Sequence, residues 1–140
     1  MNKSRFCSSE FIAEISSIYG VSGREEKVRD FIISNLSKDV SYKVDNMGNL
    51  LVHKKGKSSP KNKLMLCAHM DEVGFIITYI TDSGYLKFDT LGGIDPAVII
   101  GKPVVLESGV TGVVALKHIH QCNAEDSRVL PPISALCIDI

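Results

Sequence analysis

Apolar residues recur at helical spacing in the first quarter of the chain. Residues 9–19 are predicted to form an amphipathic helix, because their apolar positions fall at i, i+1, i+4, i+7 and i+8 counted from Phe11. A second helix is predicted after residue 22, because Ser22 and Glu25 have the spacing of a capping box. The buried stripe expected for this helix is Val28, Phe31, Ile32 and Leu36. We therefore expect Ser22 to cap a helix and not to act as a nucleophile.

The pattern changes toward strands near residue 40. Segments 40–44 (VSYKV) and 50–54 (LLVHK) flank the turn signal DNMGN, which predicts a hairpin. A solvated basic loop, KKGKSSPKNK, follows at 54–63. The continuous apolar run LMLCA at 64–68 is typical of a strand covered on both faces.

After residue 72 the chain consists of short β-rich segments between glycine-containing turns such as TDSG, LGG and ESG. The segments are VGFIITYI, GYLKFD, KPVVLES and TGVVALKHI. This pattern predicts a barrel or a sandwich without helices, and the segment LGGIDP is expected to be a turn. The sequence therefore predicts an α/β unit over 1–72 and an all-β unit over 73–140.

Composition narrows the classes of function. The 140 residues carry 16 basic and 16 acidic side chains, so no net field attracts nucleic acid or an anionic membrane. The hydrophobic share of 44% is that of a globular chain. No apolar run is long enough to span a bilayer, and the first ten residues lack a signal-peptide core. The four cysteines are scattered, which favours a reduced, cytoplasmic setting.

The strongest candidate chemistry follows the apolar run 64–68. His69 lies at the expected end of that strand, and Asp71 is two residues further on. A metal-binding histidine usually donates its other ring N–H to a carboxylate, so His69 could be a ligand and Asp71 its orienting partner. The same two residues could instead be polar caps of a strand end. Cys67 is expected to be a small residue of the core.

A second metal site is conceivable near the end of the chain. His118, His120 and Cys122 alternate, and Cys137 is a further candidate ligand of a type that suits zinc. Alternating positions on a strand share a face in any case, so the spacing is also what an ordinary strand produces.

Several motifs, in the same order, give the chain a resemblance to the M42 family of metallo-aminopeptidases. They are GVSGREEKVRDFI, DNMGNL, AHMDEVGF, GYLKFDTLGGIDP, IGKPVVL, TGVVALKHIH and LCIDI. The resemblance implies the α/β start of a zinc-exopeptidase-like catalytic domain, followed by a β-barrel insertion used in dimerisation, with both parts incomplete. It also implies that His69 binds one of two divalent metals, zinc or cobalt, and that Asp71 orients it.

The resemblance implies that the complete enzyme removes N-terminal residues from peptides and forms homo-oligomers. The family's other ligands and its general base have no counterpart in these 140 residues, so we expect the isolated chain to be inactive. An alternative is a non-catalytic oligomerisation module that pairs with a full-length or complementing chain. A polysaccharide hydrolase needs two facing carboxylates, whereas Asp71 and Glu72 would point to opposite faces of a strand.

Overall fold

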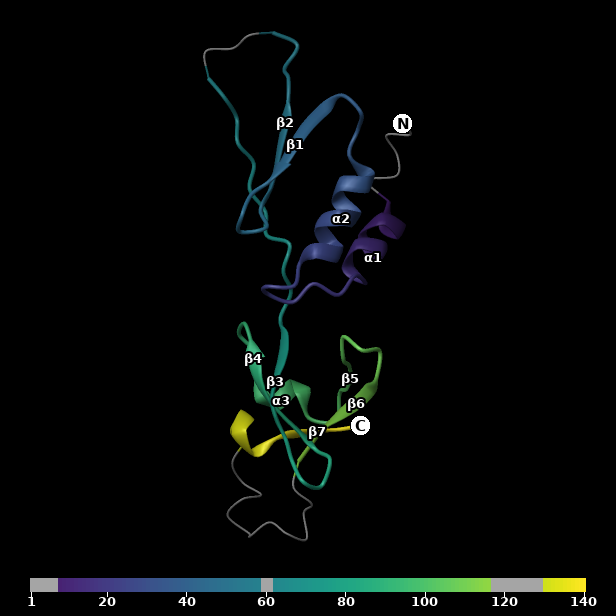
Figure 1. The fold of residues 1–140 in the computed structure, drawn as a ribbon, viewed down its shortest axis with the longest axis vertical. Coiled ribbons are helices and arrows are strands. Elements are labelled where there is room, and N and C mark those ends of the chain that lie inside the picture. The colour runs from purple at the N-terminus through teal and green to yellow at the C-terminus, as the bar shows by residue number, and fades with distance from the viewer. Residues whose placement is uncertain (1–7, 59–61, 117–129) are drawn as a thin grey trace. The chain divides into compact units, whose positions relative to one another are not determined.

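The computed structural model describes residues 8–58, 62–116 and 130–140. Its contacts divide the chain into two compact units, Met1–Glu72 (unit 1) and Val73–Ile140 (unit 2) (Figure 1). The division falls where the apolar pattern changes along the sequence. Among the described residues, no helix is long and apolar enough to cross a membrane.

Two helices open unit 1, as the periodicity predicts. α1 spans Ser9–Ser16, and the Ser8 hydroxyl caps it by accepting a hydrogen bond from the backbone N–H of Phe11 at 3.2 Å. α2 spans Glu26–Asn35. The rings of Phe11 and Phe31 lie 5.7 Å apart, so the apolar faces of the two helices pack against each other.

The predicted capping box is wrong. Glu25 occupies the N-cap position of α2 and makes no side-chain cap hydrogen bond. The chain first makes a turn, in which the backbone N–H of Arg24 donates to the carbonyl oxygen of Val21 and Gly23 adopts φ +86°. This turn places the start of the helix beyond the reach of Ser22, whose hydroxyl bonds elsewhere.

The hairpin prediction is confirmed. β1 (Val40–Val44) pairs with β2 (Leu50–Lys54) in antiparallel register. The Asp45 carboxylate organises the turn between them by accepting hydrogen bonds from the backbone N–H groups of Met47 and Asn49, both at 2.9 Å. The side-chain amide of Asn49 donates to the same carboxylate at 3.0 Å, and this bond is the main cause of a lowered Asp45 pKa.

The strand predicted at 64–68 is wrong for the described structure. This segment has no strand pairing, and Leu64, Met65 and Leu66 are 87%, 81% and 87% exposed. Cys67, which we expected in the core, is exposed as well. An apolar run becomes a buried strand only when other strands pair with it, and no described residue does so here.

Unit 2 is built on a five-stranded antiparallel sheet in the order β3-β4-β7-β6-β5. The strands are β3 (Gly74–Ile80), β4 (Leu86–Leu91), β5 (Pro103–Val105), β6 (Thr111–Ala115) and β7 (Cys137–Asp139). In the described residues β3 and β5 are edge strands, so the sheet is open and not a closed barrel. A short 3₁₀ helix, η4 (Ile133–Ala135), precedes β7.

An α-helix also interrupts the described part of unit 2, where the sequence predicted no helix. α3 spans Pro96–Ile99, at the end of the LGGIDP segment. The Asp95 carboxylate accepts a hydrogen bond from the N–H of Ala97 at 2.9 Å, and Pro96 takes the first helical position. A single turn has no periodicity to detect, but it brings Ile99 into the core.

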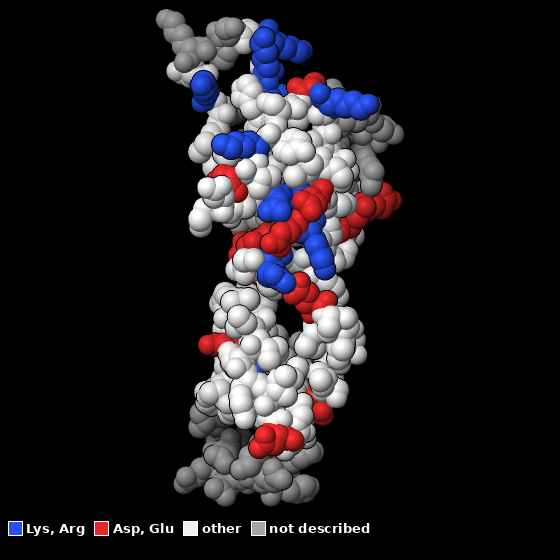
Figure 2. All heavy atoms as spheres, in the orientation of Figure 1, with Lys and Arg blue, Asp and Glu red and all other residues white. Residues whose placement is uncertain are grey.

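The buried side chains of unit 2 form one apolar cluster between the sheet and α3. Its members are Leu86, Phe88, Ile99, Val114, Leu136 and Ile138. On the face drawn in Figure 2, unit 2 is mostly uncharged, whereas charged side chains of both signs lie on unit 1.

Gly112→Ala should destabilise unit 2. A Cβ at this buried position of β6 would lie 2.6 Å from the carbonyl oxygen of Asp139 and 2.7 Å from Ile138 Cγ2. Backbone on the neighbouring strand cannot move aside cheaply, so we expect a loss of about 1–3 kcal/mol in the free energy of unfolding. Chemical denaturation measures this. Gly93→Ala, where a Cβ meets nothing within 4 Å, is the matched control and should be nearly neutral.

Asn49→Ala should reduce stability in a pH-dependent way. The lowered pKa of Asp45 means that its ionised form is stabilised in the folded state, so its contribution is present at neutral pH. That contribution is lost as the pH falls through the folded-state pKa. The difference in unfolding free energy between wild type and Asn49→Ala should therefore shrink on acidification.

Asn46→Ala alters the same turn without removing a hydrogen-bond partner of Asp45, and it serves as the control. A difference between wild type and Asn49→Ala that stays constant from neutral to acidic pH would contradict this account.

Candidate metal site

The segment 69–72 is held in place by the loop after α1, through bonds between Glu72 and Gly20, which lies 52 residues earlier in the chain. The backbone N–H of Glu72 donates to the carbonyl oxygen of Gly20 at 2.8 Å. The Glu72 carboxylate accepts a hydrogen bond from the N–H of Gly20 at 3.1 Å. Val21 and Glu72 also form an isolated parallel bridge. Glu72 therefore fixes the backbone on which His69 and Asp71 stand.

Gly20 is required by close packing at this junction. The residue is buried, and a Cβ on it would lie 2.5 Å from Val28 Cγ2 and 3.5 Å from the carbonyl oxygen of Met70. Val28 is itself only 6% exposed, so its side chain has little room to move. The absence of a side chain at residue 20 lets the loop and the segment 69–72 approach closely.

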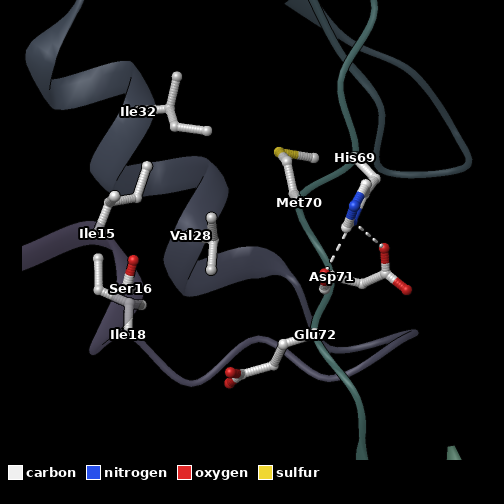
Figure 3. Close-up of a pocket in the computed structure, with 9 residues that line it drawn as sticks. All are labelled: Ile15, Ser16, Ile18, Val28, Ile32, His69, Met70, Asp71 and Glu72. Atoms are coloured by element: carbon white, nitrogen blue, oxygen red, sulfur yellow. Dashed lines mark hydrogen bonds and ion pairs between the residues drawn. The ribbon is translucent and has the colours of Figure 1, made fainter. Parts of the chain in front are cut away.

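The His69 ring meets Asp71 through one nitrogen. Its Nδ1 atom lies 2.9 Å from the Asp71 carbonyl oxygen and 3.1 Å from the carboxylate Oδ1 (Figure 3). Both partners accept hydrogen bonds, so Nδ1 carries the proton and donates. In the neutral ring Nε2 then holds the lone pair, and the His69 side chain is 85% exposed. This is the tautomer that a metal bound at Nε2 needs.

Asp71 is the centre of a short chain of hydrogen bonds. The Ser22 hydroxyl donates to its Oδ2 atom at 2.5 Å, while Oδ1 faces His69. The Ser22 hydrogen bond is the largest cause that lowers the pKa of Asp71, and the His69 ring acts in the same direction. Asp71 is therefore a carboxylate at neutral pH, suited to hold an imidazole N–H.

Open pockets lie on both sides of the segment 69–72 within unit 1. The apolar side of one pocket is lined by Ile15 of α1, Ile18 of the loop after α1, and Val28 and Ile32 of α2 (Figure 3). The other is lined by the hairpin turn at 47–49 and by Glu25. His69 and Asp71 border both pockets, so a ligand can reach the site from solvent.

The described residues do not complete a metal site. No group of three His, Cys, Asp or Glu side chains comes together in the part of the chain that the structure covers. The alternative set His118, His120 and Cys122 lies outside the described residues. Cys137 is half-buried in β7, with its Sγ 3.8 Å from the carbonyl oxygen of Ala115. His69 thus offers one imidazole ligand with its orienting carboxylate.

Sequence reasoning missed the parts played by Gly20, Ser22 and Glu72. The capping-box spacing drew attention to Ser22, but its hydroxyl serves a carboxylate 49 residues away and not a helix end. The sequence predicts no function for Glu72, whose side chain and backbone both bind Gly20 in the structure. These contacts join segments that are far apart in the sequence, so the spacing of neighbouring residues does not predict them.

Gly20→Ala should destabilise unit 1, because of the contact with Val28. We expect a loss of about 1–3 kcal/mol in the free energy of unfolding. In a Val28→Ala background the added methyl group has space, and the same substitution should cost much less. A double-mutant cycle by chemical denaturation tests this coupling. Equal costs in both backgrounds would show that the packing of residue 20 against Val28 is unimportant.

The chain has clear similarity to known proteins. Residues 48–140 match the family model described as M42 glutamyl aminopeptidase. A relative from Acetivibrio thermocellus, described as an inferred aminopeptidase, is 39% identical over 132 residues, which are 94% of this chain and 38% of the relative.

Two solved structures have the same fold over most of the chain. Pyrococcus horikoshii TET1 peptidase, described as assembling into a tetrahedron or a large octahedral shell, is 37% identical with a TM-score of 0.77. The match covers 94% of this chain and 39% of that one. A Thermotoga maritima protein described as an endoglucanase is also 37% identical, with a TM-score of 0.73, over 89% of this chain and 36% of that one.

The chain therefore spans under two fifths of the length of the proteins it matches. The family model covers residues 48–140, which include AHMDEVGF and every motif after it. The chain belongs to the M42 glutamyl aminopeptidase family.

Proposed function

We propose that this chain is the N-terminal portion of a dinuclear-metal aminopeptidase that hydrolyses N-terminal residues from peptides. One observation carries the proposal: the His69 ring donates from Nδ1 to Asp71 and leaves Nε2 accessible. A preoriented imidazole of this kind is typical of metal-binding histidines. Membership of a family described by an aminopeptidase activity supports the same reaction class.

His69, Asp71 and Glu72 have different roles in the proposed site. His69 would hold one metal through Nε2, Asp71 fixes the tautomer and direction of the ring, and Glu72 holds the backbone of both on Gly20. A divalent metal pair, when bound, polarises the peptide carbonyl and activates water. Imidazole and carboxylate ligands suit zinc or cobalt. The described residues supply one imidazole ligand with its orienting carboxylate, which do not make a two-metal site, so we expect the isolated chain to be inactive.

The whole protein acts as a homo-oligomer. Support comes from the P. horikoshii relative, which is described as able to assemble into a tetrahedron or a large octahedral shell, and from β3 and β5, which are edge strands of the unit 2 sheet in the described residues. An alternative function for the chain follows from the same edges. It would be a non-catalytic module that pairs with a full-length or complementing chain. Neither reading involves nucleic acid or a membrane.

A second enzyme class is favoured only by the T. maritima relative described as an endoglucanase. A glycosidase needs one carboxyl group with a raised pKa to protonate the leaving oxygen. Asp71 has a lowered pKa because Ser22 and His69 hydrogen-bond to it. Glu72 is bound to the backbone of Gly20. The geometry around His69 therefore supports a peptidase better than a glycosidase.

A chimera tests the proposal. Replacing the matched segment of P. horikoshii TET1 peptidase with this chain supplies the missing ligands, and aminoacyl p-nitroanilides with added Zn²⁺ or Co²⁺ report activity. His69→Ala should lower kcat/KM more than about 100-fold, and Asp71→Asn by about 10–100-fold. The isolated chain should be inactive.

His53→Ala is the matched control, because His53 is an exposed histidine of β2 away from the site. Full activity in a folded His69→Ala chimera would refute the assignment of His69 as a ligand. Hydrolysis of carboxymethylcellulose, with no action on aminoacyl substrates, would instead favour the glycosidase.

A further inference from the structure

The Asp71 carboxylate is shared between two donors from different parts of unit 1. Its Oδ2 atom accepts from the Ser22 hydroxyl at 2.5 Å, and its Oδ1 atom lies 3.1 Å from His69 Nδ1. An ionised carboxylate can only accept, so Ser22 must be the donor in the first bond. The three side chains form a directed series in which Ser22 and His69 both donate to Asp71.

The Asp71 carboxylate needs the hydrogen bond from Ser22, in addition to the one from His69, to stay in position. Its side chain is 38% exposed, and the terminal torsion of an aspartate is soft, so water could compete for either oxygen. Ser22 stands on a loop that is itself fixed to the segment 69–72, since Gly20 exchanges two hydrogen bonds with Glu72. The hydroxyl is therefore held at a set distance from the carboxylate it serves.

We propose that Ser22 is a positioning residue for the metal-binding histidine. By occupying Oδ2 it keeps Oδ1 on His69 Nδ1, and this holds the neutral ring in the form that is protonated at Nδ1, with the Nε2 lone pair directed outward. The importance of this positioning of His69 for catalysis rests on the proposed function. The hydrogen bonds among Ser22, Asp71 and His69 themselves do not involve a metal. A serine that the sequence pattern predicted as a helix cap thus belongs to the site.

The backbone carbonyl of Asp71 is a second acceptor that could fix the His69 ring without Ser22. The Asp71 carbonyl oxygen also lies 2.9 Å from His69 Nδ1, closer than the carboxylate. If that carbonyl alone fixed the ring, the Ser22 hydroxyl would have no effect on the tautomer.

The tautomer of His69 can be measured directly. Long-range ¹H–¹⁵N correlation spectra of the ¹⁵N-histidine-labelled chain in EDTA, at a pH well above the ordinary titration range of histidine, separate the two neutral forms. Wild type should be mainly protonated at Nδ1. Ser22→Ala should lower the ratio of the Nδ1–H to the Nε2–H form by roughly two- to tenfold, the change expected from loss of one hydrogen bond.

Ser22→Thr and Ser22→Val make a sharper pair, because they have the same shape and differ in the hydroxyl. The threonine variant should keep the wild-type ratio and the valine variant should behave like Ser22→Ala. Ser16→Ala removes a hydroxyl from the wall of a pocket that His69 and Asp71 also line, and it should leave the tautomer ratio unchanged. An unchanged ratio in a folded Ser22→Val chain, or equal ratios for valine and threonine, would overturn the proposal.

This experiment is independent of the metal assignment. Activity that survives His69→Ala in the chimera would refute the proposed function and leave the tautomer result standing. A tautomer unaffected by residue 22 would refute the role of Ser22 and leave the metal assignment intact.

Discussion

The reciprocal hydrogen bonds between Gly20 and Glu72 are the constraint on which the site depends. Among the described residues of unit 1, Val28 is the one buried apolar side chain. The bonds to Gly20 tie the loop after α1 to the segment that carries His69. Because residue 20 has no side chain, this junction closes against α2. The tautomer of the histidine is then set by residues whose backbone is already fixed.

Local patterns predicted the elements that local forces form. The helix at 9–19 and the hairpin at 40–54 were foreseen, since periodicity and a turn signal act over a few residues. α3 was missed because a single turn has no period, although Asp95 and Pro96 mark its start. The strand at 64–68 was predicted from apolar composition alone. Strand formation depends on a partner, and composition does not say whether one is present.

The site, like the fold, was predicted from the sequence only where its contacts are local. His69 and Asp71 are two residues apart, so a contact between them could be inferred from spacing, and the structure brings them together. Ser22 and Asp71 are 49 residues apart, and their contact depends on how the loop folds back. The capping-box pattern identified Ser22 as a residue with a hydrogen-bonding task. It did not identify the partner, because the turn at Gly23 moved the helix start away.

The exposed segment 64–66 has a consequence for handling the protein. An exposed, uncharged, apolar stretch outside a sheet is a template for intermolecular β-pairing, so we expect copies of the chain to aggregate through it. The lysine-rich stretch immediately before it works against this, because like charges keep two copies of the segment apart. That repulsion is screened by salt over about 10 Å at 0.1 M. A higher ionic strength therefore weakens this protection of the segment 64–66.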